Sequence, residues 1–532
     1  MKLFKTALFF FACLGLAFVT FAQTNQPPNR TFLKGIFTAR PGTVIELTNN
    51  NNEVLSVTAG NDGNPIFSRN SFSFIIRYVI GANYQVRISK APAGQVCNIY
   101  ANAEGTVKEN VNELRVGCDS AELVSRSSDD KSFGTFYDSN SVVIGGKGAD
   151  EGRYVAFVSS AVGLGGSKGK FRQIMWRDRN TGETRIVSAT ANGGEGNQNS
   201  FAPAISADGK SVAFESYATN LVPTDTNNAR DIFVWNADRN TITAVSTRQG
   251  ETEANYQSYE PTISGDGNLI AFTSDATNLI PNIMGISSTN VYLKDIRSGA
   301  IKIISVDEKT KKGGGGSVPS ISEDGTRIAF CNFAPLNSED KNNLWDIYVW
   351  ENGNPKLKRI SKTSSGTERN QGDDSSSRVV SPSISGNGKF VAFATTATNM
   401  VSNDTNGLQD VFVADVDSGR VVAASIGADG TKGNGDSPIG QGEKIAISND
   451  GNWVAFSTKA TNLGGNILMR NLITGEIRAI SKETGLTVGQ PVMSRDASYI
   501  VFGTSRQLDS RFQTSGIFAV FTALSRCRFC PE

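Results

Sequence analysis

Residues 206–214 read Ser-Ala-Asp-Gly-Lys-Ser-Val-Ala-Phe, and this stretch decides the fold because the chain repeats it. The pattern Ser-x-Asp-Gly-x-x-Val-Ala-Phe recurs, with drift, through the larger part of the chain. Counted between successive phenylalanines, the copies lie 57, 58, 58, 63, 63 and 46 residues apart. Periods of this kind are typical of propellers and other repeat architectures. The copies end at Phe157, Phe214, Phe272, Phe330, Phe393, Phe456 and Phe502.

One copy contains four short strand-like runs. Residues 203–206 form the first and residues 212–214 the second, and Asp208-Gly209 between them supplies the positive φ that a tight hairpin needs. A long connection leads to a third run at 231–235, and a short turn leads to a fourth at 242–246. Four antiparallel strands per unit, repeated radially, predict an all-β chain built as a β-propeller.

The last copy lacks a fourth strand. It supplies runs at 491–494, 499–503 and 517–521, whereas the isolated run Glu-Leu-Val-Ser at 122–125 is similar to the fourth strand of other copies. We predict that residues 122–125 complete the last blade. Segments from both ends of the region would then share one blade and close a seven-bladed ring.

The repeat also carries a family resemblance. Ser-x-Asp-Gly-x-x-Val-Ala-Phe followed by Asp-Ile-Phe-Val, as at residues 231–234, resembles the TolB-like, WD40-related propeller repeats of bacterial exported proteins. The resemblance covers about residues 120 to 523. It implies a propeller outside the cytoplasm, although propellers of that family often have six blades and this chain has seven copies.

The first residues are typical of a secretory signal. Lys2 and Lys5 precede an apolar run at 7–18, and Thr-Phe-Ala at 20–22 ends in a small residue. We predict cleavage after Ala22 and export to the periplasm or the cell surface. No later apolar run approaches the ~18 residues that a membrane span requires.

Residues 31–118 alternate apolar and polar side chains in six or seven short runs separated by Asn and Gly clusters. This pattern predicts an antiparallel β-sandwich. Pro-Ala-Gly-Gln-Val-Cys at 92–97 and Val-Gly-Cys at 116–118 resemble bacterial Ig-like modules. The predicted organisation is therefore a signal peptide at 1–22, an Ig-like sandwich at 23–119, a propeller at 120–525 and a tail at 526–532.

Five cysteines remain once the predicted signal is removed. Cys97 and Cys118 flank two strand-like runs in one small segment, and we predict a disulfide between them. Cys527 and Cys530 are predicted to form a terminal staple, with a partner thiol or redox chemistry as alternatives. Cys331 directly follows a strand core and is predicted to be a small buried hydrophobe.

The composition excludes several classes of function. The 532 residues include no histidine, so no Ser-His-Asp triad, Cys-His pair or histidine metal site can be built. Lys and Arg number 52 against 51 Asp and Glu, and this balance argues against a general nucleic-acid binder. We expect a monomer that does not bind nucleic acid.

Three connections between second and third strands share Asp-x-Asn-x-x-x-Asp. Oxygen ligands at alternate positions are what a Ca²⁺ loop would supply. The other interpretation, which we favour, is that Asp and Asn cap turns through backbone hydrogen bonds, since no bidentate Glu follows. Apart from this possible Ca²⁺, no cofactor is expected. The residues are Asp225, Asn227 and Asp231; Asp340, Asn342 and Asp346; and Asp404, Asn406 and Asp410.

Strand order predicts two different faces. The 2–3 and 4–1 connections are long and emerge on one face, whereas the 1–2 and 3–4 connections are tight turns on the other. The long-loop face should carry the partner-binding surface. Its candidate anchors are residues of the types that dominate interfaces: Tyr217, Arg230, Tyr256, Tyr259 and Trp345.

These observations favour an exported, non-catalytic propeller scaffold that binds another protein. The alternative is an extracytoplasmic carbohydrate-active or peptide-processing enzyme that uses carboxylates, for example Glu215 and Glu260 as a glycosidase pair. Converging carboxylates in the central channel would favour the enzyme, and their absence would favour binding.

Overall fold

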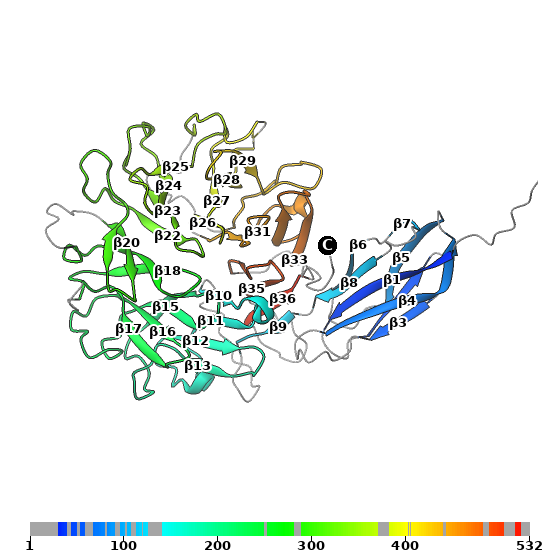
Figure 1. Cartoon of the computed structure of the whole chain (residues 1–532), viewed down its shortest axis with the longest axis horizontal. Coiled ribbons are helices and arrows are strands. Elements are labelled where there is room, and N and C mark those ends of the chain that lie inside the picture. The colour runs from blue at the N-terminus through cyan, green and yellow to red at the C-terminus, as the bar shows by residue number, and fades with distance from the viewer. Residues whose placement is uncertain are drawn as a thin grey trace, which may run out of the picture.

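The computed structural model of the chain is built from strands (Figure 1). It describes residues 30–39, 44–49, 54–58, 68–79, 82–90, 96–101, 104–107, 113–119, 121–125, 141–248, 253–280, 289–370, 382–402, 404, 406–439, 443–481, 489–504 and 516–522. Within these ranges the helical segments are three single 3₁₀ turns, Gly148–Asp150, Leu164–Gly166 and Thr461–Leu463. The prediction of an all-β chain is confirmed.

Seven four-stranded antiparallel sheets form the blades of a propeller (Figure 1). Blade 1 comprises β10 (Val142–Gly145), β11 (Tyr154–Ser159), β12 (Gln173–Asp178) and β13 (Thr184–Ile186). Blade 2 comprises β14 (Ser200–Ile205), β15 (Ser211–Ser216), β16 (Asp231–Asn236) and β17 (Thr241–Ala244). Blade 3 comprises β18 (Ser258–Ile263), β19 (Leu269–Ser274), β20 (Asn290–Asp295) and β21 (Ile301–Ile303). Blade 4 comprises β22 (Ser317–Ile321), β23 (Arg327–Asn332), β24 (Asp346–Glu351) and β25 (Lys358–Arg359). Blade 5 comprises β26 (Ser383–Ile384), β27 (Phe390–Thr395), β28 (Asp410–Asp415) and β29 (Val421–Ala423). Blade 6 comprises β30 (Ala446–Ile447), β31 (Trp453–Ser457), β32 (Ile467–Asn471) and β33 (Ile477–Ser481).

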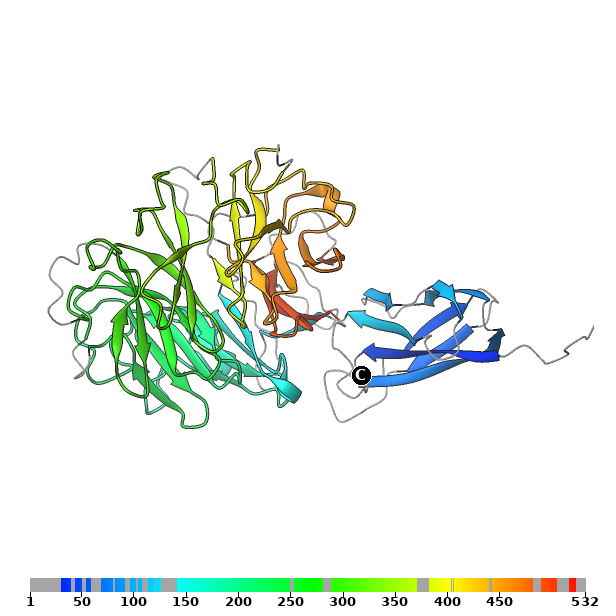
Figure 2. The same cartoon turned by 45° about the horizontal axis from the view of Figure 1, so that its top comes forward.

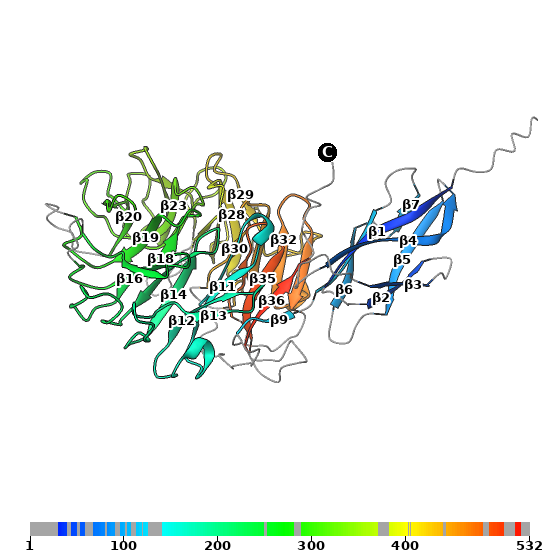
Figure 3. The same ribbon diagram turned by 60° about the horizontal axis from the view of Figure 1, so that its bottom comes forward.

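Blade 7 takes strands from both ends of the region, as predicted. Its sheet order is β34 (Val492–Met493), β35 (Tyr499–Thr504), β36 (Gly516–Phe521) and β9 (Ala121–Leu123). β9 is antiparallel to β36, with Leu123 opposite Phe518, and it lies beside β36 in Figures 1 and 3. The ring therefore closes at seven blades, and β36 has no free edge along this pairing.

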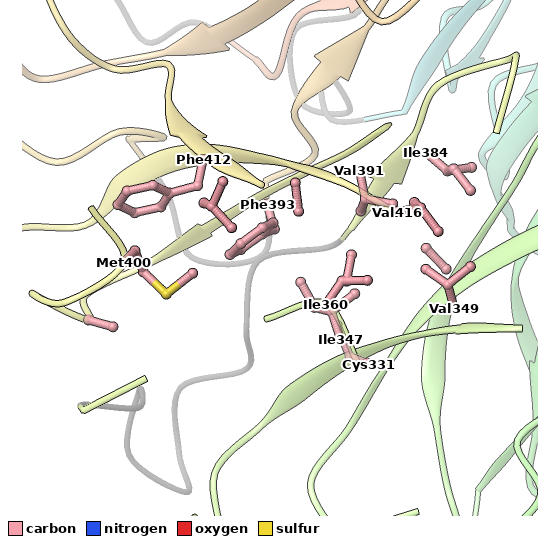
Figure 4. Packing of buried hydrophobic residues seen from close by; sticks show 14 residues of the cluster. Cys331, Ile347, Val349, Ile360, Ile384, Val391, Phe393, Met400, Phe412 and Val416 are labelled. Carbon is pink, nitrogen blue, oxygen red and sulfur yellow. The ribbon is translucent and has the colours of Figure 1, made fainter. Parts of the chain in front are cut away.

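The apolar core of the propeller is divided among the interfaces between blades. Each of seven buried clusters joins residues of two neighbouring blades, and each contains one phenylalanine of the repeat. Figure 4 shows the interface between blades 4 and 5, where Phe393 and Met400 of blade 5 share a cluster with Ile347 of blade 4. Cys331 lies in the same cluster with its side chain buried, as predicted.

The Ser-x-Asp-Gly stretch of the repeat forms the turn between first and second strands. In blade 2 the Ser206 hydroxyl donates to Asp208 Oδ1 at 2.5 Å and accepts the Ser211 N–H at 2.9 Å. Gly209 has φ +75°, and a Cβ there would collide with the Tyr154 ring of the preceding blade. The same serine bonds recur at Ser264, Ser322, Ser385, Ser448 and Ser494.

These turns also link the blades to one another. Ala207 of blade 2 accepts the N–H of Gly146 in blade 1 and donates its own N–H to the Gly265 carbonyl in blade 3. Equivalent backbone bonds continue from Gly265 to Glu323, from Glu323 to Gly386, from Asn387 to Asn449 and from Asn449 to Arg495. Inside this ring lies a cavity of about 150 Å³ that residues of all seven blades line, with an Arg495–Glu323 ion pair across it.

The N-terminal strands form a separate unit beside the propeller (Figure 2). One sheet has the order β4 (Ser68–Val79), β1 (Arg30–Ala39), β8 (Glu113–Asp119), β6 (Val96–Ala101), and the other β3 (Val54–Thr58), β2 (Val44–Asn49), β5 (Asn83–Lys90), β7 (Glu104–Thr106). Ile45, Leu47 and Val86 are buried on one face of the second sheet. The described residues of this unit form eight strands instead of the six or seven predicted, and the β1–β8 pair is parallel, so the expectation of an antiparallel sandwich is wrong for that pair. The Ig-like assignment stays a prediction.

The predicted signal peptide at 1–22 and the pair Cys527 and Cys530 lie outside the described residues. Within the described part of the chain, no helix is long and apolar enough to cross a membrane.

Replacing Leu123 by Ala should test ring closure. Leu123 is fully buried in β9, so its truncation should lower the free energy of unfolding by about 2–5 kcal/mol in chemical denaturation. Ile473→Ala, at an exposed turn of blade 6, is the matched control and should change stability by less than about 0.5 kcal/mol. Equal effects of the two substitutions would contradict closure through β9.

The register of the N-terminal unit sharpens the disulfide prediction. β6 and β8 are antiparallel neighbours, and Cys97 is the direct Cα partner of Cys118. Directly opposed residues of antiparallel strands have the Cα separation that a disulfide needs. Peptide mapping of the exported protein without reduction should recover the two cysteines in one cross-linked peptide. Recovery of both as free thiols would contradict the pairing.

Candidate functional site

The two ends of the propeller differ as the strand order predicted. In blade 2 the chain takes residues 217–230 to pass from β15 to β16 and residues 245–257 to pass from β17 to β18. The 1–2 and 3–4 connections of the same blade span only residues 206–210 and 237–240. We call the two ends the loop face and the turn face. The predicted anchors Tyr217, Arg230, Tyr256, Tyr259 and Trp345 all lie on or beside the loop face.

Three of these anchors meet around one guanidinium group. Arg230 donates from Nη2 to the Tyr217 hydroxyl at 2.9 Å and from Nη1 to Glu215 Oε1 at 3.0 Å. Its guanidinium carbon lies 5.1 Å from the centre of the Tyr217 ring and 5.4 Å from that of Tyr259, within cation–π range. The Glu215 side chain is 6% exposed and that of Arg230 is 27% exposed. We call Glu215, Tyr217, Arg230 and Tyr259 the arginine cluster.

Burial and the groups bonded to Glu215 shift the pKa of its carboxyl in opposite directions. Desolvation raises the pKa of the Glu215 carboxyl, while the Glu260 N–H and Arg230 partly offset the rise. Desolvation also raises the pKa of Tyr259, whose hydroxyl donates to Asp275 Oδ1 at 3.2 Å. The cluster is thus a half-buried cation held by a carboxylate and two aromatic rings.

Carboxylates do converge near the propeller axis on the loop face. Glu215 Oε2 accepts the N–H of Glu260 in blade 3 at 2.8 Å, and Glu260 Oε2 accepts the N–H of Val318 in blade 4 at 2.9 Å. Lys444 of blade 6 is close enough for both carboxylates to act on its charge. Its side chain keeps contact with solvent, while the surrounding protein lowers the pKa of its ammonium group.

Glu215 and Glu260 link neighbouring blades at this position. Glu260 and Val318 are non-glycine residues with φ near +55°, where the first strand of each blade bulges. The carboxylate of the preceding blade accepts the N–H at each bulge and so links neighbouring blades. The Thr273 hydroxyl also donates to Glu260 Oε2 at 2.9 Å. Sequence reasoning named both glutamates but missed Lys444, because only ring closure brings blade 6 opposite blades 2 and 3.

The remaining anchors are Tyr256 and Trp345. Tyr256 is 58% exposed on the connection between blades 2 and 3. Trp345 packs against Phe333, with ring centres 5.8 Å apart, and Phe333 is 40% exposed. The sequence analysis did not identify Phe333, because one phenylalanine in a loop carries no motif.

The Asn residues of the three Asp-x-Asn loops cap turns. Asn227 Oδ1 accepts the Ala229 N–H at 2.6 Å, and its Nδ2 donates to Asp231 Oδ2 at 2.9 Å. Asn406 makes the same bonds with Leu408 and Asp410, and Asn342 accepts the Leu344 N–H. The turn interpretation therefore describes the Asn in all three loops.

The Asp residues of these loops face different partners in each blade. Asp340 and Asp346 form ion pairs with the buried Arg359 guanidinium, at 3.1 and 3.5 Å. Asp404 lies 3.9 Å from Lys432 Nζ, and Asp410 accepts the Ser425 hydroxyl. In blades 4 and 5 a basic side chain thus takes the place that the calcium hypothesis gave to a metal. No three His, Cys, Asp or Glu side chains of the described residues are grouped as a ready metal site.

No protein-family model and no curated protein match this chain. Similar solved structures include TolB from Acinetobacter baumannii, with 16% identity and a TM-score of 0.35 over 58% of this chain and 61% of TolB. The β-propeller domain of the Trilobed protease from Pyrococcus furiosus has 16% identity and a TM-score of 0.42 over 70% of this chain and 90% of that domain. Oligogalacturonate lyase from Vibrio parahaemolyticus has 10% identity and a TM-score of 0.45, covering 80% and 96%. The chain is similar to these proteins in fold alone, and its seven sheets establish the propeller.

Replacing Arg230 by Met should reveal the strength of the arginine cluster. The change leaves the buried Glu215 carboxylate without its cation and should cost about 3 kcal/mol of unfolding free energy, the low end for a buried pair. The double variant Glu215→Gln with Arg230→Met should lose less, since no charge is stranded. Lys210→Met breaks the exposed Lys210–Asp238 pair and should cost less than about 1 kcal/mol. Additive losses in the Glu215–Arg230 cycle, measured by denaturant titration, would contradict the coupling.

Proposed function

We propose that this chain is an exported, non-catalytic propeller scaffold that binds another protein through its loop face. One observation carries the proposal. Of the four large hydrophobic side chains that the described propeller exposes, Val162, Tyr256 and Phe333 lie on the loop face, with 66%, 58% and 40% exposure. Only Ile473 lies on the turn face. The three side chains belong to different long connections, and such connections are where binding residues concentrate.

The arginine cluster supports the same surface. Tyr and Arg are the residues most enriched among interface anchors, and Arg230 is already held in place by Glu215 and two tyrosine rings. A side chain that is fixed before binding loses less conformational entropy when a partner docks. Export is part of the proposal and is supported by the signal-like residues 1–22, with the periplasm or the cell surface as destination.

A second candidate is an extracytoplasmic carbohydrate-active or peptide-processing enzyme. The approach of Glu215, Glu260 and Lys444 near the axis favours it, because converging carboxylates are what such chemistry needs. We prefer the scaffold because each glutamate already accepts hydrogen bonds from the neighbouring blade. Glu260→Gln should therefore leave partner binding intact and would abolish activity only if the enzyme alternative holds.

Tyr256→Ala should weaken capture of the partner from the native cell envelope. Truncation of an exposed aromatic anchor costs about 1.4 kcal/mol or more, roughly a tenfold loss of affinity. Ile473→Ala, which removes an exposed apolar side chain (75% against 58% for Tyr256) from the turn face, is the control and should bind as the wild type does. Quantitative pull-down with the two variants compares the faces directly. Loss of binding by Ile473→Ala but not by Tyr256→Ala would place the partner on the turn face.

A further inference from the structure

Backbone hydrogen bonds join the turns of neighbouring blades at six of the seven junctions, and the junction between blade 7 and blade 1 is the exception. The bonds run in order around the turn face, from the Gly146 N–H on the Ala207 carbonyl to the Asn449 N–H on the Arg495 carbonyl. Among the described residues, no backbone–backbone bond joins blade 7 to blade 1. We call this junction the seam. It flanks the blade that takes strands from both ends of the propeller region.

At the seam a side-chain carboxyl group takes the place of a backbone acceptor. Glu151 Oε1 accepts the Asp496 N–H at 3.4 Å, and the Arg495 N–H also acts on this carboxyl group. The sequence explains why the group is available. Counted back from Phe157, Glu151 has the position of the turn Asp or Asn, but Ala149 replaces the serine that bonds that residue in the six other blades.

Blade 7 brings one negative and one positive side chain to the seam. The Asp496 side chain is exposed and near enough to act on the charge of Glu151. Arg495 would offset that effect, but its guanidinium group forms the ion pair with Glu323 across the axis. An ionised Glu151 therefore faces a second carboxylate and a cation that is shared with blade 4.

The charged groups of blade 1 around this turn are engaged elsewhere. Arg153 pairs with Asp150 at 2.9 Å and with Asp178 at 2.7 Å. Arg179 lies over the Tyr499 ring of blade 7, with its guanidinium carbon 4.5 Å from the ring centre. Within the described residues, no basic side chain forms an ion pair with the half-buried Glu151.

Glu151 gains its charge near neutral pH. Burial and the Asp496 carboxylate raise the pKa of the Glu151 carboxyl to about 7, although Arg495 and the two N–H groups act against the rise. The chain has no histidine, the residue that ordinarily titrates in this range. Burial also raises the pKa of Asp225 in blade 2, to about 6, so the two effects have to be separated by substitution.

We propose that Glu151 is a pH-sensitive latch, which holds blade 7 against blade 1 more firmly when its carboxyl group is protonated than when it is ionised. The protonated group still accepts the Asp496 N–H through its carbonyl oxygen, and it no longer repels the Asp496 carboxylate. A carboxyl group whose pKa is higher in the folded than in the unfolded chain stabilises the fold while it is protonated. That stabilisation is complete below the ordinary value of 4.5 and is lost as the pH rises through about 7. This inference does not depend on the partner of the loop face.

Denaturant titration of the full chain at pH 5 and pH 8 tests the latch. Glu151→Gln stays neutral at both pH values and keeps a carbonyl oxygen for the Asp496 N–H. From pH 5 to pH 8 the wild type should lose up to about a hundredfold in its folding equilibrium relative to Glu151→Gln. Glu183→Gln changes an exposed glutamate of the same blade and should follow the wild type at both pH values. Parallel pH dependence of the wild type and Glu151→Gln would overturn the proposal.

Hydrogen exchange of the same proteins locates the effect. At pH 8 the blade 7 turn, residues 494–499, should exchange faster in the wild type than in Glu151→Gln, and at pH 5 the two should match. Asp496→Asn, which removes the neighbouring charge from the other side of the seam, should likewise slow exchange of this turn at pH 8. The turns that link blades 3 and 4 should be unaffected, because a backbone bond joins them. Equal exchange of residues 494–499 in the wild type and Glu151→Gln at pH 8, or a difference spread evenly over all seven turns, would contradict a latch at the seam.

Discussion

Every blade of the propeller presents two apolar faces, and only the blades on either side can cover them. The seven buried clusters lie between blades, and each holds one phenylalanine of the repeat. A blade alone would therefore leave its motif side chain in water, at a cost of roughly 1.5–3 kcal/mol for that residue alone. Stability depends on an unbroken ring, which explains why β9 is taken from the far end of the region to complete blade 7. For the same reason, the contribution of one blade to the free energy of unfolding cannot be separated from that of its neighbours.

Ring closure divides the molecule into a face that assembles the fold and a face that is free to vary. On the turn face the Ser-x-Asp-Gly turns are used twice, first to close each hairpin through the serine hydroxyl and then to bond the next blade through the backbone. Substitutions there disturb both functions. On the loop face the connections are held by fewer repeated contacts. For example, the Asn197 N–H of a 4–1 connection donates to Asn220 Oδ1 of a 2–3 connection, and Asn220 Nδ2 donates back to the Glu195 carbonyl. Between such fixed points, side chains such as Tyr256 and Phe333 are open to change without loss of the ring.

The sequence predicted the fold well because the fold is periodic. Seven copies of one motif fixed the blade count, and residues 122–125 could be assigned because only one copy lacked a fourth strand. The site was predicted in part. The types of the anchors and their face followed from strand order, and Tyr217, Arg230 and Tyr259 do meet. The contact of Glu215 with Glu260, and the presence of Lys444 beside them, depend on side-chain directions at the axis, which no spacing along the chain reveals. The N-terminal unit was predicted least well, since its parallel β1–β8 pair joins distant segments that share no repeat.

Repetition also supplies an internal comparison that a single site lacks. Blades 2, 4 and 5 each hold a serine–aspartate bond at the start of the third strand, so the charges around that bond can be compared on a common geometry. Blade 4 surrounds its carboxylates with two guanidinium groups, blade 5 uses one ammonium group, and blade 2 carries Glu253 instead. The serine–aspartate bond is present in all three blades, so these places share a local geometry and differ in the charges around it. The strand positions and the serine–aspartate bond therefore set the shape of this part of the blade, whereas the loop residues around it set its charge.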